Sequence, residues 1–160
     1  MGKIEELSTP NGTVILSGSP DLRVVLVEDD PDLRTIICRL WEQVTLPEKP
    51  TLAITDDAEW AITFIAQAPR LTVLVTDVLM PKMNGRELAR KVRARFPETA
   101  IAYLTVVEGA HLAGDDVDDT FSKTSPNLAQ QLALLTPFLA MRRRLLLTNA
   151  HLRDRPLSLV

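Results

Sequence analysis

Several polar residues of this sequence directly follow short apolar runs, which are the places where strands of a sheet end. Acidic residues follow residues 23–27, a further aspartate follows residues 71–76, and a threonine and a lysine follow residues 100–104 and 120–122. In chain order these residues are Glu28, Asp29, Asp30, Asp77, Thr105 and Lys123. Parallel strands end at one edge of a sheet, where open α/β sheets bind ligands. The pattern therefore predicts an acidic site with one hydroxyl and one ammonium group.

The crowded carboxylates indicate the chemistry of this site. Carboxylates that lie close together repel one another, which raises the pKa of some of them unless they share a cation. Mg²⁺ is the natural partner, because it takes an octahedral oxygen shell from carboxylates, waters and substrate phosphate. An aspartate beside such an ion can attack a phosphoryl group and hold it as an acyl phosphate. The ion, the Lys123 ammonium and the Thr105 hydroxyl would then offset the charge on the transferring oxygens.

Apolar runs that alternate with helical stretches supply the elements that must position these groups. The runs are continuous rather than alternating, which is typical of parallel strands covered by helices on both faces. We expect an α/β fold with a doubly wound, five-stranded parallel sheet. The predicted strands are 23–27, 51–55, 71–76, 100–104 and 120–122. The predicted helices are 31–44, 57–68 and 85–96, a shortened one within 107–119, and one capped by Ser125 with Pro126 at its first position.

Composition limits the class of protein. The 160 residues hold 18 Lys and Arg against 21 Asp and Glu, and the lone Cys38 excludes internal disulfides and multi-cysteine metal sites. No apolar run approaches the roughly 20 residues that span a bilayer, and the first residues do not resemble a signal peptide. We therefore expect a cytoplasmic protein of one domain without a membrane partner.

Charge is unevenly distributed along the chain. Residues 1–140 carry a net charge of −7, whereas residues 141–160 carry +4. Binding to a phosphate backbone needs clustered Lys and Arg, which the main body lacks. The tail alone is too short for a helix-turn-helix domain. We expect no nucleic-acid partner.

Four sequence blocks together resemble the receiver domain of bacterial two-component response regulators. The resemblance extends over residues 22–136 and implies the flavodoxin-like strand order 2-1-3-4-5. The third block, an aspartate followed by Met-Pro and Gly at fixed spacing, is the most specific. The blocks are Val27-Glu28-Asp29-Asp30-Pro31-Asp32-Leu33-Arg34, Leu104-Thr105, Phe121-Ser122-Lys123 and Val75-Thr76-Asp77-Val78-Leu79-Met80-Pro81-Lys82-Met83-Asn84-Gly85.

The resemblance implies a role for each matching residue. Asp77 would accept the phosphoryl group, and Asp29, the Asp77 carboxylate and the backbone carbonyl of Leu79 would hold Mg²⁺, with Glu28 acting through water. Thr105 would bond the phosphoryl group, and Lys123 would form a salt bridge with it. The chain would then be a phosphorylation-activated switch, an enzyme only toward its own aspartate. Its phosphoryl donor would be a sensor histidine kinase or a phosphotransfer protein.

Three positions depart from the family pattern. Thr124 follows Lys123 where the family has a proline, commonly after a cis bond. Val106 follows Thr105 where a smaller residue leaves room for the phosphoryl group, and Thr120 replaces an aromatic switch residue. The stretch from Thr105 to Lys123 is also short, which costs most of the fourth helix. The sequence therefore leaves open whether output uses the fourth-helix face that is usual in the family.

The two ends of the chain lie outside the matching region. We interpret residues 1–21 as an N-terminal arm, residues 22–136 as the receiver domain and residues 137–160 as a C-terminal helical extension. Phe138, Met141 and Leu145, with Leu146 as a further candidate, form an apolar stripe that a receiver core does not require. Exposed stripes of this kind mark partner surfaces. We expect a homodimer through this helix, with folding back onto the same domain as the alternative.

Two other functional interpretations compete with the switch. A phosphate-independent pseudo-receiver could act as a dimeric scaffold or adaptor, which Thr120, Thr124 and Val106 would permit. A phosphohydrolase of the haloacid dehalogenase type also uses a nucleophilic aspartate after a strand. That family needs a second aspartate two residues later, where this chain has Leu79, so the site lacks the general acid/base. Asp30 is interpreted as a helix cap and not as a site residue.

Overall fold

The computed structural model describes residues 12–67, 71–81, 84–106 and 115–153. Within these residues the strands form one six-stranded sheet in the order β1-β3-β2-β4-β5-β6. The strands are β1 (Val14–Leu16), β2 (Ser19–Val27), β3 (Pro50–Thr55), β4 (Leu71–Asp77), β5 (Ala100–Thr105) and β6 (Asp119–Ser122). The five strands from β2 to β6 pair in parallel, which confirms the predicted order.

A sixth strand, β1, extends the predicted sheet of five parallel strands. β1 pairs antiparallel with β3, with Val14 opposite Ile54 and Leu16 opposite Leu52. It comes from the segment predicted as an N-terminal arm, and β2 also begins earlier than predicted, at Ser19. The run Val14–Leu16 is too short to stand out by periodicity, so only its pairing with β3 identifies it as a strand.

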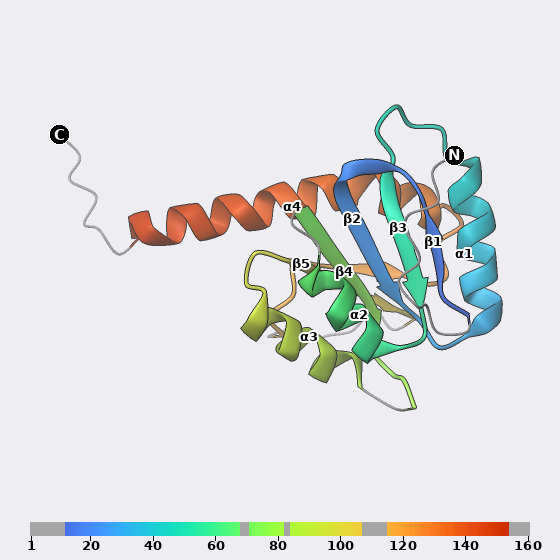
Figure 1. The fold of residues 1–160 in the computed structure, drawn as a ribbon, viewed down its shortest axis with the longest axis horizontal. Helices are drawn as coiled ribbons and strands as arrows, with labels where there is room; N and C mark the ends of the chain where they lie inside the picture. Colours follow the sequence, from blue (N-terminus) through green and yellow to red (C-terminus); the bar gives the residue numbers. More distant parts are fainter. Residues whose placement is uncertain (1–11, 68–70, 82–83, 107–114, 154–160) are drawn as a thin grey trace.

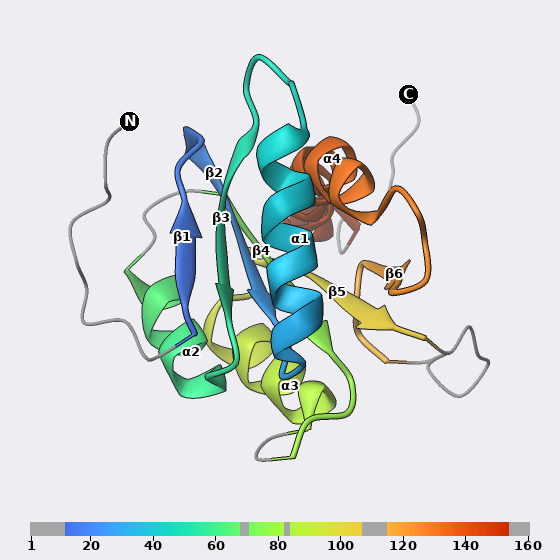
Figure 2. The ribbon, with the colours of Figure 1, turned by 90° about the vertical axis from the view of Figure 1, so that its right-hand side faces the viewer.

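Four helices of the described residues cover both faces of the sheet (Figure 1). Figure 2 shows α1 and α4 on one face and α2 and α3 on the other. One core cluster accordingly joins α1 and α4 to the sheet, and a second joins α2 and α3 to it. The helices are α1 (Pro31–Gln43), α2 (Ala58–Ala66), α3 (Gly85–Arg95) and α4 (Leu128–Arg153).

Local chemistry sets where three helices begin. Asp30 caps α1, and its carboxylate accepts hydrogen bonds from the amides of Asp32 and Leu33. Asp57 caps α2 and Asn84 caps α3 in the same way. Side chains of this type satisfy amides that have no partner within the helix. The interpretation of Asp30 as a cap is confirmed, and these caps fix the loops that follow β2, β3 and β4.

Helix α4 begins later than predicted, and it is one helix across the proposed domain boundary before Pro137. It begins at Leu128 and not next to Ser125, and it continues through Pro137 without a new start. Leu132, Thr136 and Leu139 are buried against the body on both sides of this proline. Twenty-six residues at 1.5 Å rise make a helix of about 39 Å, and Figure 1 shows its last turns projecting beyond the sheet. The domain division at residues 21/22 and 136/137 stays a prediction.

Two short segments complete the description. The shortened fourth helix falls mainly on residues 107–114, which lie outside the described residues. The segment 115–118, just before β6, is held by charged contacts: Arg86 makes two hydrogen bonds to Asp115, and Arg93 bonds Asp118 at 2.9 Å. None of the helices in the described ranges combines the length and the apolar character needed to cross a membrane.

Candidate functional site

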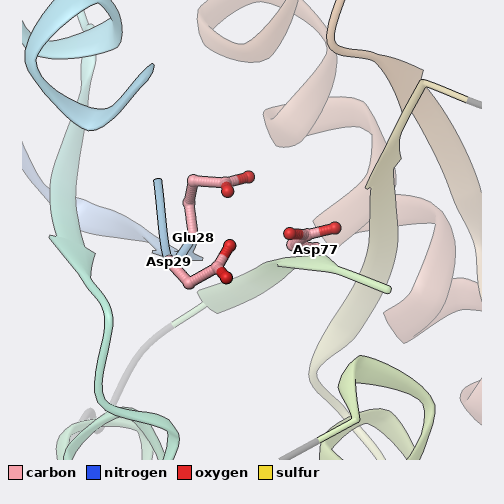
Figure 3. A group of neighbouring side chains, drawn as sticks. All are labelled: Glu28, Asp29 and Asp77. Atoms are coloured by element: carbon pink, nitrogen blue, oxygen red, sulfur yellow. The ribbon is translucent and has the colours of Figure 1, made fainter. Parts of the chain in front are cut away.

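Three carboxylates gather at the carboxyl edge of the sheet. Glu28 and Asp29 follow the last residue of β2, and Asp77 ends the neighbouring strand β4, so the parallel pairing of these strands brings them together. One carboxylate oxygen from each of the three residues lies within 4.8 Å of the other two (Figure 3). Glu28 and Asp77 are buried, and Asp29 is half-buried. The Asp30 carboxylate instead accepts hydrogen bonds from the amides of the first turn of α1, as expected for a helix cap.

Lys123 reaches this cluster from the loop after β6. Its Nζ lies 2.8 Å from Glu28 Oε2 and 2.9 Å from Asp77 Oδ2. The backbone positions it, since the amide of Lys123 donates to the carbonyl of Thr105 at 3.0 Å. The Lys123–Thr124 peptide bond is trans, as are all described peptide bonds. Lys123 therefore contacts the acidic cluster without the proline that follows it in the family pattern.

Burial and charge act in opposite directions on these groups. Burial raises the pKa of Glu28 to about 7, although the contact with Lys123 works against this rise. For Lys123, burial by itself would lower the pKa. Hydrogen bonds and charge attraction from Glu28 and Asp77 outweigh burial, and the pKa of Lys123 is raised. Lys123 is thus held in its charged form between two acids.

Thr105 and Leu79 complete the predicted set. Thr105 is buried at the end of β5, one strand from Asp77. Leu79 lies two residues after Asp77, and its amide donates to Asp77 Oδ1 at 3.3 Å. The Leu79 side chain is 75% exposed and Val106 is 65% exposed. Each predicted site residue thus lies at the carboxyl edge of the sheet, and Lys123 directly contacts both Glu28 and Asp77.

The turn after Asp77 leaves no room for a side chain at Gly85. A Cβ atom there would collide with the carbonyl oxygen of Asp77. The Gly85 amide also donates to the carbonyl of Val78 at 2.9 Å. A close approach of backbone to backbone therefore explains this glycine, which ties the start of α3 to Asp77.

Sequence reasoning did not assign Arg34 and Thr55 to the site. Arg34 donates a hydrogen bond from Nη1 to the carbonyl of Glu28 at 2.8 Å, and the Thr55 carbonyl accepts from the Glu28 amide at 2.9 Å. Arg34 lies in the acidic sequence block of residues 27–34, so the sequence shows that it is near Glu28 along the chain. The sequence does not show the hydrogen bond to the Glu28 carbonyl, because that bond forms only when the first turn of α1 folds back over Glu28.

The donor set fits a hard divalent cation. Its oxygen atoms come from three carboxylates within reach of one ion, and the described residues bring no histidine or thiol into this group. Oxygen-only ligands with few protein donors suit Mg²⁺, which keeps several waters in its shell. The acidic group of Glu28, Asp29 and Asp77 could therefore hold a metal.

The acidic site at the carboxyl edge of the sheet places the chain among the doubly wound α/β proteins, which bind ligands at this edge. Comparison with known proteins identifies the family. The family model described as response regulator receiver domain matches residues 24–127. The chain belongs to this family and contains the receiver domain of a two-component response regulator.

Individual relatives agree with this assignment. The response regulator receiver protein CpdR of Brucella abortus (strain 2308) is 33% identical over 85 residues, which span 52% of this chain and 65% of the relative. A protein-glutamate methylesterase/protein-glutamine glutaminase 4 of Myxococcus xanthus (strain DK1622) is 26% identical over 54% of this chain but only 24% of its own length. The chain thus matches less than two thirds of either curated relative.

Solved structures share the fold. The chemotaxis response regulator CheY4 of Vibrio cholerae superposes with a TM-score of 0.59 at 19% identity, over 72% of this chain and 98% of that one. The signal receiver domain of an HD domain-containing protein from Pseudomonas fluorescens Pf-5 gives 0.64 at 17% identity, over 83% and 96%. At these identities the likeness concerns the fold.

Proposed function

We propose that this chain is a phosphorylation-activated switch that accepts a phosphoryl group on Asp77 from a histidine kinase or a phosphotransfer protein and signals through protein contacts. The observation that carries the proposal is the contact of Lys123 with Asp77 at 2.9 Å, inside a cluster of three carboxylates. A nucleophilic carboxylate, a fixed cation and a metal-binding acid pair are the parts that phosphoryl transfer to an aspartate needs.

Each residue would act on the transferring group in a distinct way. When bound by Asp29, Asp77 and the Leu79 carbonyl, with Glu28 acting through water, Mg²⁺ would supply charge neutralisation at the phosphoryl oxygens. An Asp77 oxygen would form the bond to phosphorus while the bond from phosphorus to the donor's nitrogen or oxygen breaks. Lys123 would move from the Asp77 carboxylate to a phosphoryl oxygen, and the Thr105 hydroxyl would donate to another.

We also propose that the protein pairs with a second copy through α4. Leu134, Leu135, Phe138, Met141 and Leu145 are exposed on this helix, and we call them the α4 stripe. Leu134, Phe138, Met141 and Leu145 are spaced by four, three and four residues, as in the seam of a coiled coil. An antiparallel pair would keep Arg142, Arg143 and Arg144 of the two copies apart, whereas a parallel pair would place them side by side.

The switch is tested by incubating the protein with Mg²⁺ and an acyl phosphate and measuring its intact mass. We expect a single phosphoryl adduct on the wild type and none on Asp77→Asn. Asp30→Asn is the matched control, because asparagine also caps helices and the Asp30 carboxylate bonds the first amides of α1. It should be labelled like the wild type.

Other outcomes would select other functions. A chain that takes no adduct, and that beryllofluoride with Mg²⁺ leaves unchanged in its NMR spectrum, would be a phosphate-independent scaffold instead of a switch. An adduct that persists in Asp77→Asn would show that another residue accepts the phosphoryl group. Either result would overturn the proposal.

A further inference from the structure

The backbone of Glu28 is held from both sides. Its amide donates to the carbonyl of Thr55 at 2.9 Å, and its carbonyl accepts from Nη1 of Arg34 at 2.8 Å. Its carboxylate is fixed as well, since Oε1 accepts from the amide of Asp30 at 3.1 Å. Because the Glu28 carbonyl belongs to the peptide unit that leads into Asp29, the Arg34 contact sets the direction of the acidic pair.

Arg34 makes this contact from an enclosed position. Its side chain is only 11% exposed, and its Nη2 lies 3.9 Å from a carboxylate oxygen of Asp56. The backbone of Gly12 packs on the guanidinium: a Cβ atom on Gly12 would lie 3.2 Å from Arg34 Nη2. Gly12 also has a φ of +85°, a conformation that other residues rarely adopt. Gly12, just before β1, therefore packs closely against this arginine.

Strand β1 anchors Gly12 and Thr13 to the sheet at its acidic edge. The hydroxyls of Thr13 and Thr55 are hydrogen-bonded at 2.8 Å, and the Thr55 hydroxyl also accepts from the amide of Asp57. Thr55 is the residue whose carbonyl holds the Glu28 amide. The antiparallel direction of β1 is what brings its first residues to this edge, because β3 ends there.

The other end of β1 is anchored equally well. The Gly18 amide donates to the Thr51 hydroxyl at 3.1 Å, and the Ser19 amide donates to the Lys49 carbonyl at 2.6 Å. The segment from Gly12 to Gly18 is thus a built part of the sheet, although it lies outside residues 24–127 that match the family model.

We propose that Arg34 is a positioning residue that holds the Glu28–Asp29 backbone in the conformation that binds a divalent cation, and that β1 keeps Arg34 in place. This inference rests on the proposed function, in which the acidic pair binds Mg²⁺. Residues that orient metal ligands through hydrogen bonds commonly change metal affinity by about 10–100-fold when they are replaced.

Charge and positioning predict opposite effects for Arg34, which makes the inference testable. A cation near the carboxylates repels a divalent ion, so by charge alone its removal would tighten metal binding. Loss of Arg34 would also leave the negative charge of Asp56 without its cation, which would tighten metal binding further. If Arg34 positions the acidic pair, its removal weakens binding, because Glu28 and Asp29 lose the fixed backbone between them.

The experiment measures the Kd of Mn²⁺, used as a probe for the Mg²⁺ site, by the loss of the free-ion signal in electron paramagnetic resonance. Full-length wild type, Arg34→Met, Arg34→Lys and Thr13→Val are compared. Arg39→Met is the matched control, since it removes an exposed cation from the same helix. We expect Kd to rise about tenfold in Arg34→Met, with partial rescue by lysine, and to stay unchanged in Arg39→Met.

Thr13→Val tests the contribution of β1 while every charge is kept. Valine is close to threonine in shape but cannot make the hydroxyl bond to Thr55, so we expect a smaller rise in Kd in the same direction. Circular dichroism establishes that each variant is folded. Thr13→Val and Arg34→Lys decide the question if Arg34→Met does not fold.

The outcomes separate this inference from the proposed function. Wild type that binds Mn²⁺ together with unchanged or tighter binding in Arg34→Met and Thr13→Val would overturn the positioning role and leave the switch intact. Wild type that does not bind Mn²⁺ at all would overturn the metal site itself, and with it both proposals.

Discussion

Lys123 is the residue on which the electrostatics of the site depend. It is a cation between two buried acids, Glu28 and Asp77, at 2.8 and 2.9 Å. Buried carboxylates without a partner are costly, because the lost hydration is not replaced. Lys123 therefore stabilises the metal-free fold in addition to its proposed contact with a phosphoryl group.

Replacing Lys123 with methionine keeps an unbranched, slightly shorter side chain and removes its charge. We expect the free energy of unfolding at pH 7 to fall by about 1–3 kcal/mol in the absence of Mg²⁺, because Glu28 and Asp77 lose their common partner. Mg²⁺ should then stabilise the variant more than the wild type, since the ion no longer competes with an ammonium group. Urea unfolding with and without Mg²⁺ measures both effects, and equal stabilisation of the two proteins would contradict this account.

At the scale of elements, a charged contact joins α3 to the segment before β6. Arg86 in the first turn of α3 forms two hydrogen bonds of 2.7 Å with Asp115, and the Tyr103 hydroxyl donates to the same carboxylate at 2.8 Å. Arg86 lowers the pKa of Asp115, and the Tyr103 bond adds to this. Since Gly85 packs on the backbone of Asp77, this contact begins one residue from the turn that supports the acceptor.

The contact predicts a pH dependence with a definite sign. Asp115 has a lowered pKa in the folded protein, so its contribution to stability is full above its ordinary pKa of 3.8 and is lost as the pH falls through the lowered value. Asp115→Asn should be less stable than the wild type at pH 7, and the difference should shrink below about pH 4. Urea unfolding of both proteins at pH 7 and pH 3 measures it. A constant difference would mean that the ion pair contributes nothing.

Pro137 is the unusual residue of α4. A proline inside a helix has no amide to donate and crowds the carbonyl four residues earlier, yet α4 continues through it. The buried residues Leu132, Thr136 and Leu139 on either side explain this, because their packing against the sheet holds both halves of the helix.

Replacing Pro137 with alanine restores the missing amide and removes the crowding. We expect the free energy of unfolding to rise, by at most about 3 kcal/mol, because packing fitted to the proline offsets part of the gain. Thermal unfolding followed by circular dichroism measures the change. A less stable variant would show that the proline is required by the packing of α4 on the body.

At the scale of the whole molecule, the two faces of α4 differ in burial. Its inner face contributes Leu132, Leu139 and Ala140 to the core, while the α4 stripe stays exposed, with Phe138 at 70%. Truncation before residue 139 would remove core residues as well as the stripe. Point substitutions in the stripe therefore test the proposed dimer more cleanly.

The double variant Phe138→Glu, Leu145→Glu should reduce the molar mass from that of a dimer to that of a monomer, because it places charges in the shared apolar seam. Light scattering during size-exclusion chromatography measures this for the full chain. Gln130→Glu, exposed near the start of α4 and outside the stripe, is the control and should stay dimeric. A monomeric wild type would refute the pairing.

The sequence by itself determined the parallel sheet and the group of residues at its edge. Continuous apolar runs identify buried parallel strands without any knowledge of contacts, and residues that follow such strands must share one edge. Glu28, Asp29, Asp77, Thr105 and Lys123 could therefore be assigned to one site, and the turn after Asp77 could be recognised from its spacing.

Only the tertiary structure decided how this edge is built. β1 has three residues and is a strand only because β3 lies beside it, and Arg34 supports Glu28 only because α1 folds back over the end of β2. The continuation of α4 through Pro137 depends on packing against the sheet, which outweighs a local preference to stop. Each of these features depends on residues far apart in the chain or on packing over a whole element, and a local pattern does not carry that information.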